Sequence, residues 1–194
     1  MNDIQATLLT LLNSYGDIVE LEWDFDVDNI ITKLSANNNW VTGPSISAPQ
    51  ALSLTGSDTL DLKVKDKKEG EYNTNLKSCP SLVEFFDKWN SLAKCHAVKM
   101  DAGNFFRLHR DAYKTTQQMR IFIPLNKTEI HQWNFLYDTK RVEFKPGVPY
   151  VLNTRKQHGS FAMEGRIYHI LMSLYLTEDN LKTIINSLPN CKER

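Results

Sequence analysis

Three side chains in the second half of the sequence are of types that bind a transition metal. His109 and Asp111 stand two residues apart at the end of the apolar run NFFRLHRD. In a β-strand, residues i and i+2 point to the same face, so this imidazole and this carboxylate are expected to project together. His158, in LNTRKQHGSF, is the candidate third ligand. Two histidines and one carboxylate on one face of an octahedron leave three positions open, a pattern typical of Fe(II) sites where a chelating co-substrate and O₂ bind.

Two arginines are candidates for holding a carboxylate beside this metal site. Arg166 opens the long apolar run RIYHILMSLYL, eight residues after His158. A planar guanidinium binds a carboxylate through two parallel hydrogen bonds, so we expect Arg166 to hold the co-substrate. Arg120, in QMRIFIPLN, is the alternative, since strand alternation places it on the face of Phe122 and Pro124. It would contact co-substrate or substrate, or serve structure alone.

Two smaller polar residues are further candidates for contacts with the co-substrate. Asn153 is a polar residue in an otherwise apolar strand, and Ser160 lies two residues from His158. Each would donate a hydrogen bond to a bound molecule or stabilise the site around the metal ligands.

The other three histidines are expected to bind no ligand. His169 follows Arg166 by three residues, so alternation places the two on opposite faces of the strand. His131 lies in an expected turn, and His96 precedes the strands that carry the metal ligands.

The elements that position these residues are read from the spacing of apolar residues. Residues 3–14 and 27–36 predict helices, and residues 17–25 alternate like a strand. Residues 81–92 predict an amphipathic helix whose aromatic stripe is core packing, and the final segment predicts a helix capped at Thr177. These helices are expected to cover one face of a sheet.

From about residue 96 the sequence consists of short apolar runs separated by turn residues. Eight or so strands at this spacing favour an antiparallel sandwich or barrel. The runs are HAVKM, NFFRLH, MRIFIPL, WNFLY, RVEFK, PYVLN, SFAM and RIYHILMSLYL. The chain is therefore predicted to be an α+β protein.

Composition excludes several classes of partner. Lys plus Arg and Asp plus Glu number 23 each, so neither a nucleic acid nor an anionic membrane is expected. The cysteines, Cys79, Cys95 and Cys191, are odd in number and form no CxxC motif, which favours reduced thiols. The chain begins without the basic and apolar segments of a signal peptide, so we expect a cytoplasmic protein.

One polar region interrupts the predicted elements. Residues 35–79 are rich in Asn, Ser, Thr, Gly and Lys, and the charge run KVKDKKEGE covers residues 63–71. We interpret the charge run as a solvated loop, whereas the sequence leaves open whether residues 35–79 are ordered or form a lid over the substrate.

Residues 98–176 resemble the double-stranded β-helix core of the Fe(II)/2-oxoglutarate-dependent dioxygenases. The resemblance is carried by FFRLHRDA with RIFIPLN, by EFKPGVPYVLNTRKQHGSF and by GRIYHILMSLYL. Within that superfamily the chain is similar to the aspartyl/asparaginyl β-hydroxylase and proline-hydroxylase-like branch. The resemblance implies one domain with a jelly-roll, cupin-like core at 96–176, a helical and loop portion at 1–95 packed on one sheet, and a C-terminal helix at 177–194.

The same resemblance implies an activity. His109, Asp111 and His158 would bind Fe(II), and Arg166 would bind 2-oxoglutarate. The enzyme would use O₂ to hydroxylate a C–H bond of a small-molecule amino acid or of an Asp, Asn or Pro residue in a peptide or protein, releasing succinate and CO₂. Two alternatives stay open: a cupin-type metalloenzyme without 2-oxoglutarate, and a non-catalytic binding module on the same fold.

Overall fold

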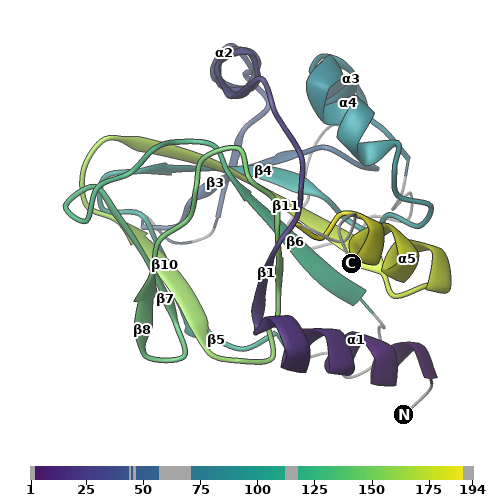
Figure 1. Ribbon diagram of the computed structural model, residues 1–194. Coiled ribbons are helices and arrows are strands. Elements are labelled where there is room, and N and C mark those ends of the chain that lie inside the picture. Colours follow the sequence, from purple (N-terminus) through teal and green to yellow (C-terminus); the bar gives the residue numbers. More distant parts are fainter. Residues whose placement is uncertain (1–2, 44, 46, 57–70, 112–117, 190–194) are drawn as a thin grey trace.

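Two antiparallel sheets packed face to face form the centre of the molecule (Figure 1). The computed structural model describes residues 3–43, 45, 47–56, 71–111 and 118–189. The larger sheet has the order β1-β9-β6-β11-β4-β3-β2, and the smaller sheet has the order β5-β10-β7-β8. The strands are β1 (Ile18–Glu20), β2 (Val41–Thr42), β3 (Gln50–Ser53), β4 (His96–Asp101), β5 (Phe105–His109), β6 (Gln118–Pro124), β7 (Trp133–Tyr137), β8 (Lys140–Val142), β9 (Tyr150–Leu152), β10 (His158–Ala162) and β11 (Arg166–Tyr175).

The helices cover the outer face of the larger sheet, away from the smaller one (Figure 1). They are α1 (Asp3–Tyr15), α2 (Val27–Ser35), α3 (Thr74–Lys77), α4 (Pro80–Phe86) and α5 (Glu178–Asn186). Helix α5 begins at the predicted cap, because the Asn180 amide donates to the Thr177 hydroxyl at 3.2 Å. Within the described ranges, no helix combines the length and apolar character that crossing a bilayer requires.

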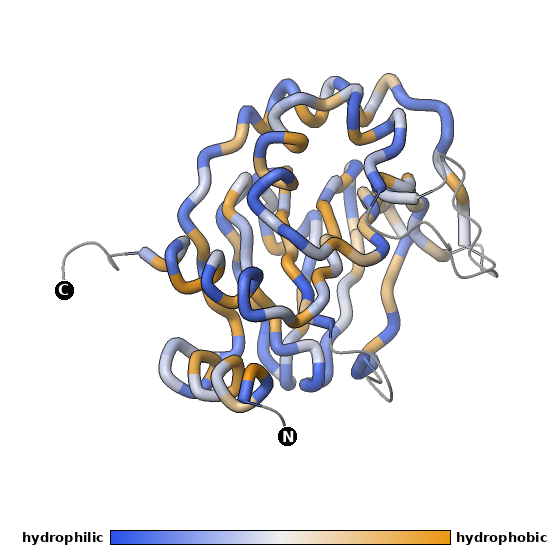
Figure 2. Tube along the Cα trace, turned by 90° about the vertical axis from the view of Figure 1, so that its right-hand side faces the viewer, coloured by the Kyte–Doolittle hydropathy of each residue, from blue (hydrophilic) through white to orange (hydrophobic). Residues whose placement is uncertain are grey.

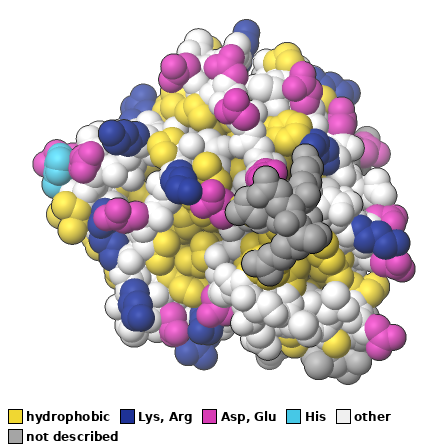
Figure 3. Space-filling view, in the orientation of Figure 1, with side chains coloured by type: hydrophobic (Ala, Val, Ile, Leu, Met, Phe, Trp, Pro, Cys, Tyr) yellow, Lys and Arg dark blue, Asp and Glu magenta, His cyan; other side chains and the backbone are white. Residues whose placement is uncertain are grey.

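Strand β11 separates two hydrophobic cores. Ile170 and Met172 face the helices, whereas Ile167 and Leu171 face the smaller sheet. Because both faces are covered, apolar residues occupy both faces of the strand, and only a few polar side chains distinguish one face from the other. Hydrophobic stretches recur along these central strands in Figure 2. Basic and acidic side chains are interspersed over the outer surface in Figure 3, as expected for a chain with no net charge.

Several predicted elements differ in length from the observed ones. The helix predicted at 81–92 ends at Phe86, because the Tyr175 amide donates to the Ser91 carbonyl at 2.9 Å and Leu92 pairs with Leu174. This pairing with the end of β11 requires an extended backbone in place of a further helical turn.

The region at 35–79, whose order the sequence left open, contains regular structure. Strands β2 and β3 extend the larger sheet at its edge, and α3 lies within the same region. A sequence rich in Asn and Ser pairs here because β4 offers a free neighbouring edge, a tertiary effect that local composition does not record. Residues 57–70, with most of the charge run, lie outside the described residues.

Candidate metal centre and its pocket

The predicted ligands meet at one end of the smaller sheet. His109 ends β5 and His158 begins β10, and the antiparallel register places them directly opposite, with ring centroids 4.4 Å apart. Asp111 follows β5, and its amide donates to the Thr154 carbonyl at 3.0 Å, which holds this residue beside the pair. One ligand atom from each of the three side chains lies within 4.8 Å of the others. The structure therefore brings together the three residues chosen from the sequence.

Both histidines are oriented by the backbone. The Nδ1 atom of His109 lies 2.8 Å from the Arg107 carbonyl, and that of His158 lies 2.9 Å from the Lys156 carbonyl. A carbonyl oxygen only accepts, so Nδ1 carries the proton and the lone pair of Nε2 is left for a metal. Two such nitrogens and one carboxylate fit a divalent transition metal with open positions, of which Fe(II) is typical.

The electrostatics keep the acidic ligand ionised. Burial by itself would raise the pKa of Asp111, but hydrogen bonding to His109 and the charge of Arg120 outweigh it and hold that pKa below its usual range. Hydrogen bonding to Asp111 raises the pKa of His109, whereas burial lowers the pKa of His158. An ionised carboxylate is the form that binds a cation.

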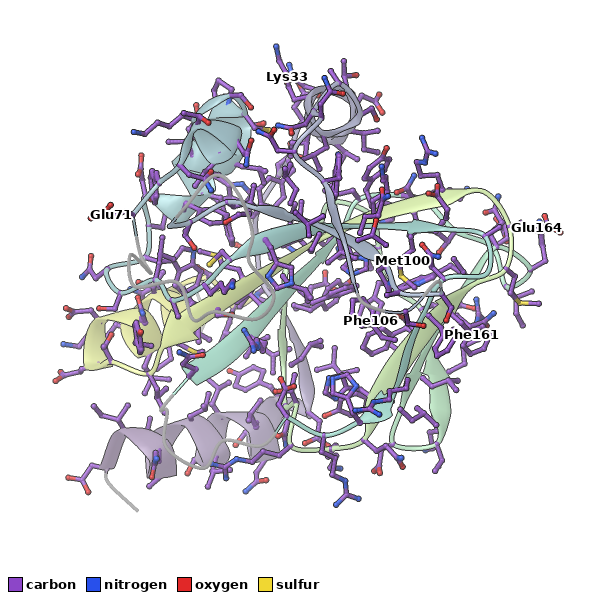
Figure 4. The ribbon with its side chains drawn as sticks, turned by 180° about the vertical axis from the view of Figure 1, so that it is seen from behind. Lys33, Glu71, Met100, Phe106, Phe161 and Glu164 are labelled. Carbon is purple, nitrogen blue, oxygen red and sulfur yellow. The ribbon has the colours of Figure 1, made fainter. Side chains whose placement is uncertain are left out.

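A pocket of about 200 Å³ opens from the three ligands into the space between the sheets. Its walls combine phenylalanine and leucine side chains with a larger number of polar and charged side chains. They comprise His96, Phe106, His109, Asp111, Arg120, Phe122, Phe135, Leu152, Thr154, His158, Gly159, Ser160, His169 and Leu171. Phe106 points into this space in Figure 4, whereas Phe161 lies on the outer side of the smaller sheet. A cavity in which apolar walls and convergent polar groups meet is typical of a small-molecule site.

The two candidate arginines occupy different environments. Arg120 lines the pocket, and its Nε atom lies 3.5 Å from Asp111 Oδ2. Arg166 does not line the pocket. By strand alternation it lies on the same face of β11 as Ile170, which faces the helices and not the smaller sheet. Its Nε atom lies 2.6 Å from Asp101 Oδ1, and 55% of its side chain is exposed. The expectation that Arg166 faces the co-substrate pocket thus disagrees with its placement in the fold.

Of the two smaller polar candidates, Ser160 lines the pocket and Asn153 does not. Ser160 is buried in the pocket wall, and its hydroxyl lies 3.6 Å from the Met100 sulfur. Asn153 does not line the pocket, since its side-chain amide donates to Asp17 Oδ1 at 2.7 Å. Asn153 therefore ties the turn before His158 to the start of β1.

Two pocket residues were missed in the sequence. His96 and His169 both line the pocket, although neither was expected to bind a ligand. The orientation of β11 was inferred from Arg166, and because apolar residues occupy both faces of this strand, its few polar residues are the only other indication of its orientation. His169, Leu171 and Ser173 share one face of the strand by alternation, and the two polar residues His169 and Ser173 were the signal that this face carries polar side chains.

Comparisons with known proteins identify the architecture. No protein-family model matches the chain, and no curated protein sequence matches it. A prolyl hydroxylase from Trichoplax adhaerens, solved with a peptide fragment of the hypoxia inducible factor oxygen degradation domain, superposes with a TM-score of 0.58 at 12% identity, covering 94% of this chain and 97% of that one. A 2OG-Fe(II) oxygenase family oxidoreductase from Burkholderia pseudomallei gives 0.57 at 12% identity, covering 89% and 90%. A Pseudomonas putida prolyl-4-hydroxylase gives 0.54 at 14% identity, covering 88% and 97%.

The chain has the fold of the 2OG-Fe(II) oxygenases. The predicted α+β double-stranded β-helix with helices on one sheet is thereby confirmed. At these sequence identities the likeness concerns the fold, and the chemistry is argued from the site's own residues.

Proposed function

We propose that this protein is a non-haem iron oxygenase that uses 2-oxoglutarate and O₂ to hydroxylate a C–H bond. The observation that carries the proposal is the convergence of His109, Asp111 and His158 in the wall of one pocket between the sheets. When bound, Fe(II) with 2-oxoglutarate and O₂ supplies the oxidation, in which one oxygen atom enters the substrate C–H bond and the other enters succinate as CO₂ leaves.

The protein's own part is to hold and orient. The backbone carbonyls of Arg107 and Lys156 keep the two imidazoles in the tautomer that presents Nε2 to the metal. Phe106, Phe122 and Phe135 in the pocket wall reduce the local polarity, which strengthens the interaction between charged groups beside them.

Arg120 is the guanidinium that we propose for the co-substrate. It is the arginine in the pocket wall, and it already forms an ion pair with a carboxylate oxygen of Asp111. The same guanidinium would attract a carboxylate of a dianionic keto acid bound beside the metal. Arg166, held by Asp101 at the far end of β11, provides a matched control of the same residue type.

The direct test is anaerobic titration of 2-oxoglutarate into protein loaded with Fe(II), followed by the weak visible charge-transfer band of the chelate. We expect a band that saturates in the wild type and is absent in His109→Ala. Arg120→Ala should weaken 2-oxoglutarate binding at least about tenfold, the effect of losing one hydrogen bond to a charged group, whereas Arg166→Ala should not. Iron binding without a band would favour the cupin-type alternative, and no iron binding would favour a binding module.

For the substrate we propose an amino-acid residue within a peptide. Support comes from the Trichoplax adhaerens enzyme, whose structure holds a peptide. In this chain a groove of about 590 Å³ lies beside the edge strand β5, which ends at His109, and this groove shares Phe106 with the metal pocket. The Phe105 amide at the start of β5 donates to the Ser47 carbonyl at 2.9 Å, and the groove continues from there along β5 toward His109. An extended peptide is the kind of ligand that binds along an edge strand. Peptides containing Pro, Asp or Asn should stimulate succinate release and gain the mass of one oxygen atom, and failure with all three would contradict this substrate class.

A further inference from the structure

The groove beside β5 has a one-sided charge. Its lining contains the cations Lys94 and Arg107, and no acidic side chain among the described residues that form it. Lys94 stands just before β4 in the larger sheet, whereas Arg107 lies in β5 of the smaller sheet, so the two cations come from the two sheets between which the groove runs. The whole chain has equal numbers of acidic and basic residues, 23 of each, so this imbalance is a local property of the groove.

Arg107 lies along the path from the groove to the metal ligands. The groove is bounded at the start of β5, where the Phe105 amide donates to the Ser47 carbonyl at 2.9 Å. Arg107 follows Phe105 by two residues and precedes His109 by two. A two-residue step along a strand is about 7 Å, which is also the length of two residues of an extended peptide. A group bound by Arg107 is therefore about two residues away from a group that reaches the metal.

Lys94 lies at the level of the metal end on the other sheet. The amide of the preceding residue, Ala93, donates to the Ser173 carbonyl at 2.8 Å, and Ser173 pairs with Arg120, which lines the metal pocket. Burial is the main cause that lowers the pKa of His96 to about 3, and the charges of Arg120 and Lys94 add to the effect, as expected for cations close to this wall.

The shape of the groove suits a main chain. A stretch of its wall before β4 consists mostly of small side chains, namely Gly43, Ser45, Ser47, Ala48 and Ala51. Small side chains leave the groove, of about 590 Å³, open for the backbone of a bound peptide. His96 and Phe106 line both this groove and the metal pocket, so the two spaces adjoin at these side chains.

We propose that the groove binds a peptide substrate through an acidic side chain about two residues from the one that is hydroxylated, with Lys94 and Arg107 as the specificity-determining residues. This inference rests on the proposed function and narrows its substrate class. Cations on both sides of a groove attract an anionic segment and disfavour a cationic one.

The test compares peptides that differ in charge alone. Dye-labelled peptides with a central proline or a central asparagine, flanked on both sides by glutamates or by glutamines, are titrated into the Zn(II)-loaded protein, with fluorescence anisotropy as the signal. The wild type should bind the glutamate peptides about 3- to 20-fold more tightly, the effect of one or two ion pairs. The preference should shrink as the salt concentration rises from about 0.05 M to about 0.5 M, because salt screens such pairs.

Matched variants assign the preference to the two cations. Lys94→Gln and Arg107→Gln should each weaken binding of the glutamate peptides about three- to fivefold and change binding of the glutamine peptides less than about twofold. Lys140→Gln makes the same change of charge at an exposed position of β8, the opposite edge of the smaller sheet, and should keep the full preference. Arg107→Glu should favour lysine-flanked peptides over glutamate-flanked ones, a reversal that a purely structural role would not produce.

Several outcomes would overturn the inference. They are equal binding of the two kinds of peptide by the wild type, no binding of either, equal losses for both in the glutamine variants, and displacement of the glutamate peptides by the same concentration of free glutamate, which would assign the groove to a free amino acid. The proposed function is tested separately, by the chelate band of 2-oxoglutarate in the Fe(II)-loaded protein. A band without a charge preference would overturn this inference alone, whereas a charge preference without a band would overturn the proposed reaction and leave an acidic-peptide site.

Discussion

The buried histidine pair should make the protein unusually sensitive to mild acid. His96 and His169 have pKa values of about 3 in the folded chain, against an ordinary value of 6.5. On unfolding below pH 6.5 each ring binds a proton that the folded state excludes. Stability is therefore fully present above pH 6.5 and is lost as the pH falls toward 3.

The magnitude follows from the shift. Between pH 7 and pH 5 each histidine should lower the free energy of unfolding by about 2 kcal/mol, so the pair should lower it by about 4 kcal/mol. That is a large part of the roughly 5–15 kcal/mol that stabilises a typical domain. The raised pKa of His109 acts in the opposite direction, because a group with a raised folded pKa stabilises the protein at lower pH.

The assay is urea unfolding of the metal-free protein at pH 7 and at pH 5, for the wild type and for the double variant His96→Gln/His169→Gln. The contribution of His109 is common to both proteins and cancels in the comparison. The wild type should lose about 4 kcal/mol more than the double variant over this range. The single variant His131→Gln, at an exposed position, controls for removal of a histidine as such. Equal losses in the wild type and the double variant would refute the reasoning that these rings are buried and neutral.

Three further predictions concern the frame around the site. Gly159→Ala should weaken metal binding and lower Tm, because a Cβ at this position would lie 2.8 Å from the Phe106 carbonyl oxygen and push β5, with its metal ligand, away from β10; metal titration and thermal unfolding measure the two effects. Asp17→Ala should cost about 1–2 kcal/mol in urea unfolding, since Asp17 accepts from Asn153 and pairs with Lys156 at 2.5 Å. Phe122→Ala should cost about 3–5 kcal/mol, because this side chain is 1% exposed between the sheets.

Each of these predictions has an outcome that contradicts it. Unchanged metal affinity in Gly159→Ala would mean that β5 and β10 separate without disturbing the ligands. Asp17→Ala is compared with Glu20→Ala, which removes a more exposed ion pair to Lys145 and should change stability by less than about 1 kcal/mol. Equal losses of stability in Asp17→Ala and Glu20→Ala would contradict the proposal that Asp17 holds the turn before His158. A loss below about 1 kcal/mol in Phe122→Ala would contradict close packing between the sheets.

The predicted strands and metal ligands depend mainly on local properties of the sequence. Turn residues between apolar runs locate the strands from β4 to β11, because a turn requires particular backbone angles wherever it occurs. His109 and Asp111 were paired by their two-residue spacing, although Asp111 lies just beyond the end of β5. Asp111 nevertheless lies beside His109, because its backbone amide donates a hydrogen bond to the Thr154 carbonyl.

Only the tertiary structure decided which polar side chains enter the pocket. Strand β11 has apolar residues on both faces, so hydrophobicity alone does not decide its orientation, and the structure places His169 inside and Arg166 outside. The choice is made by the pairing of β11 with β4 and β6 and by the helices that cover its other face. The sequence by itself determined the ligand types and the places of the strands along the chain. The pocket exists only where strands of the two sheets meet, because side-chain orientation there depends on packing between the sheets.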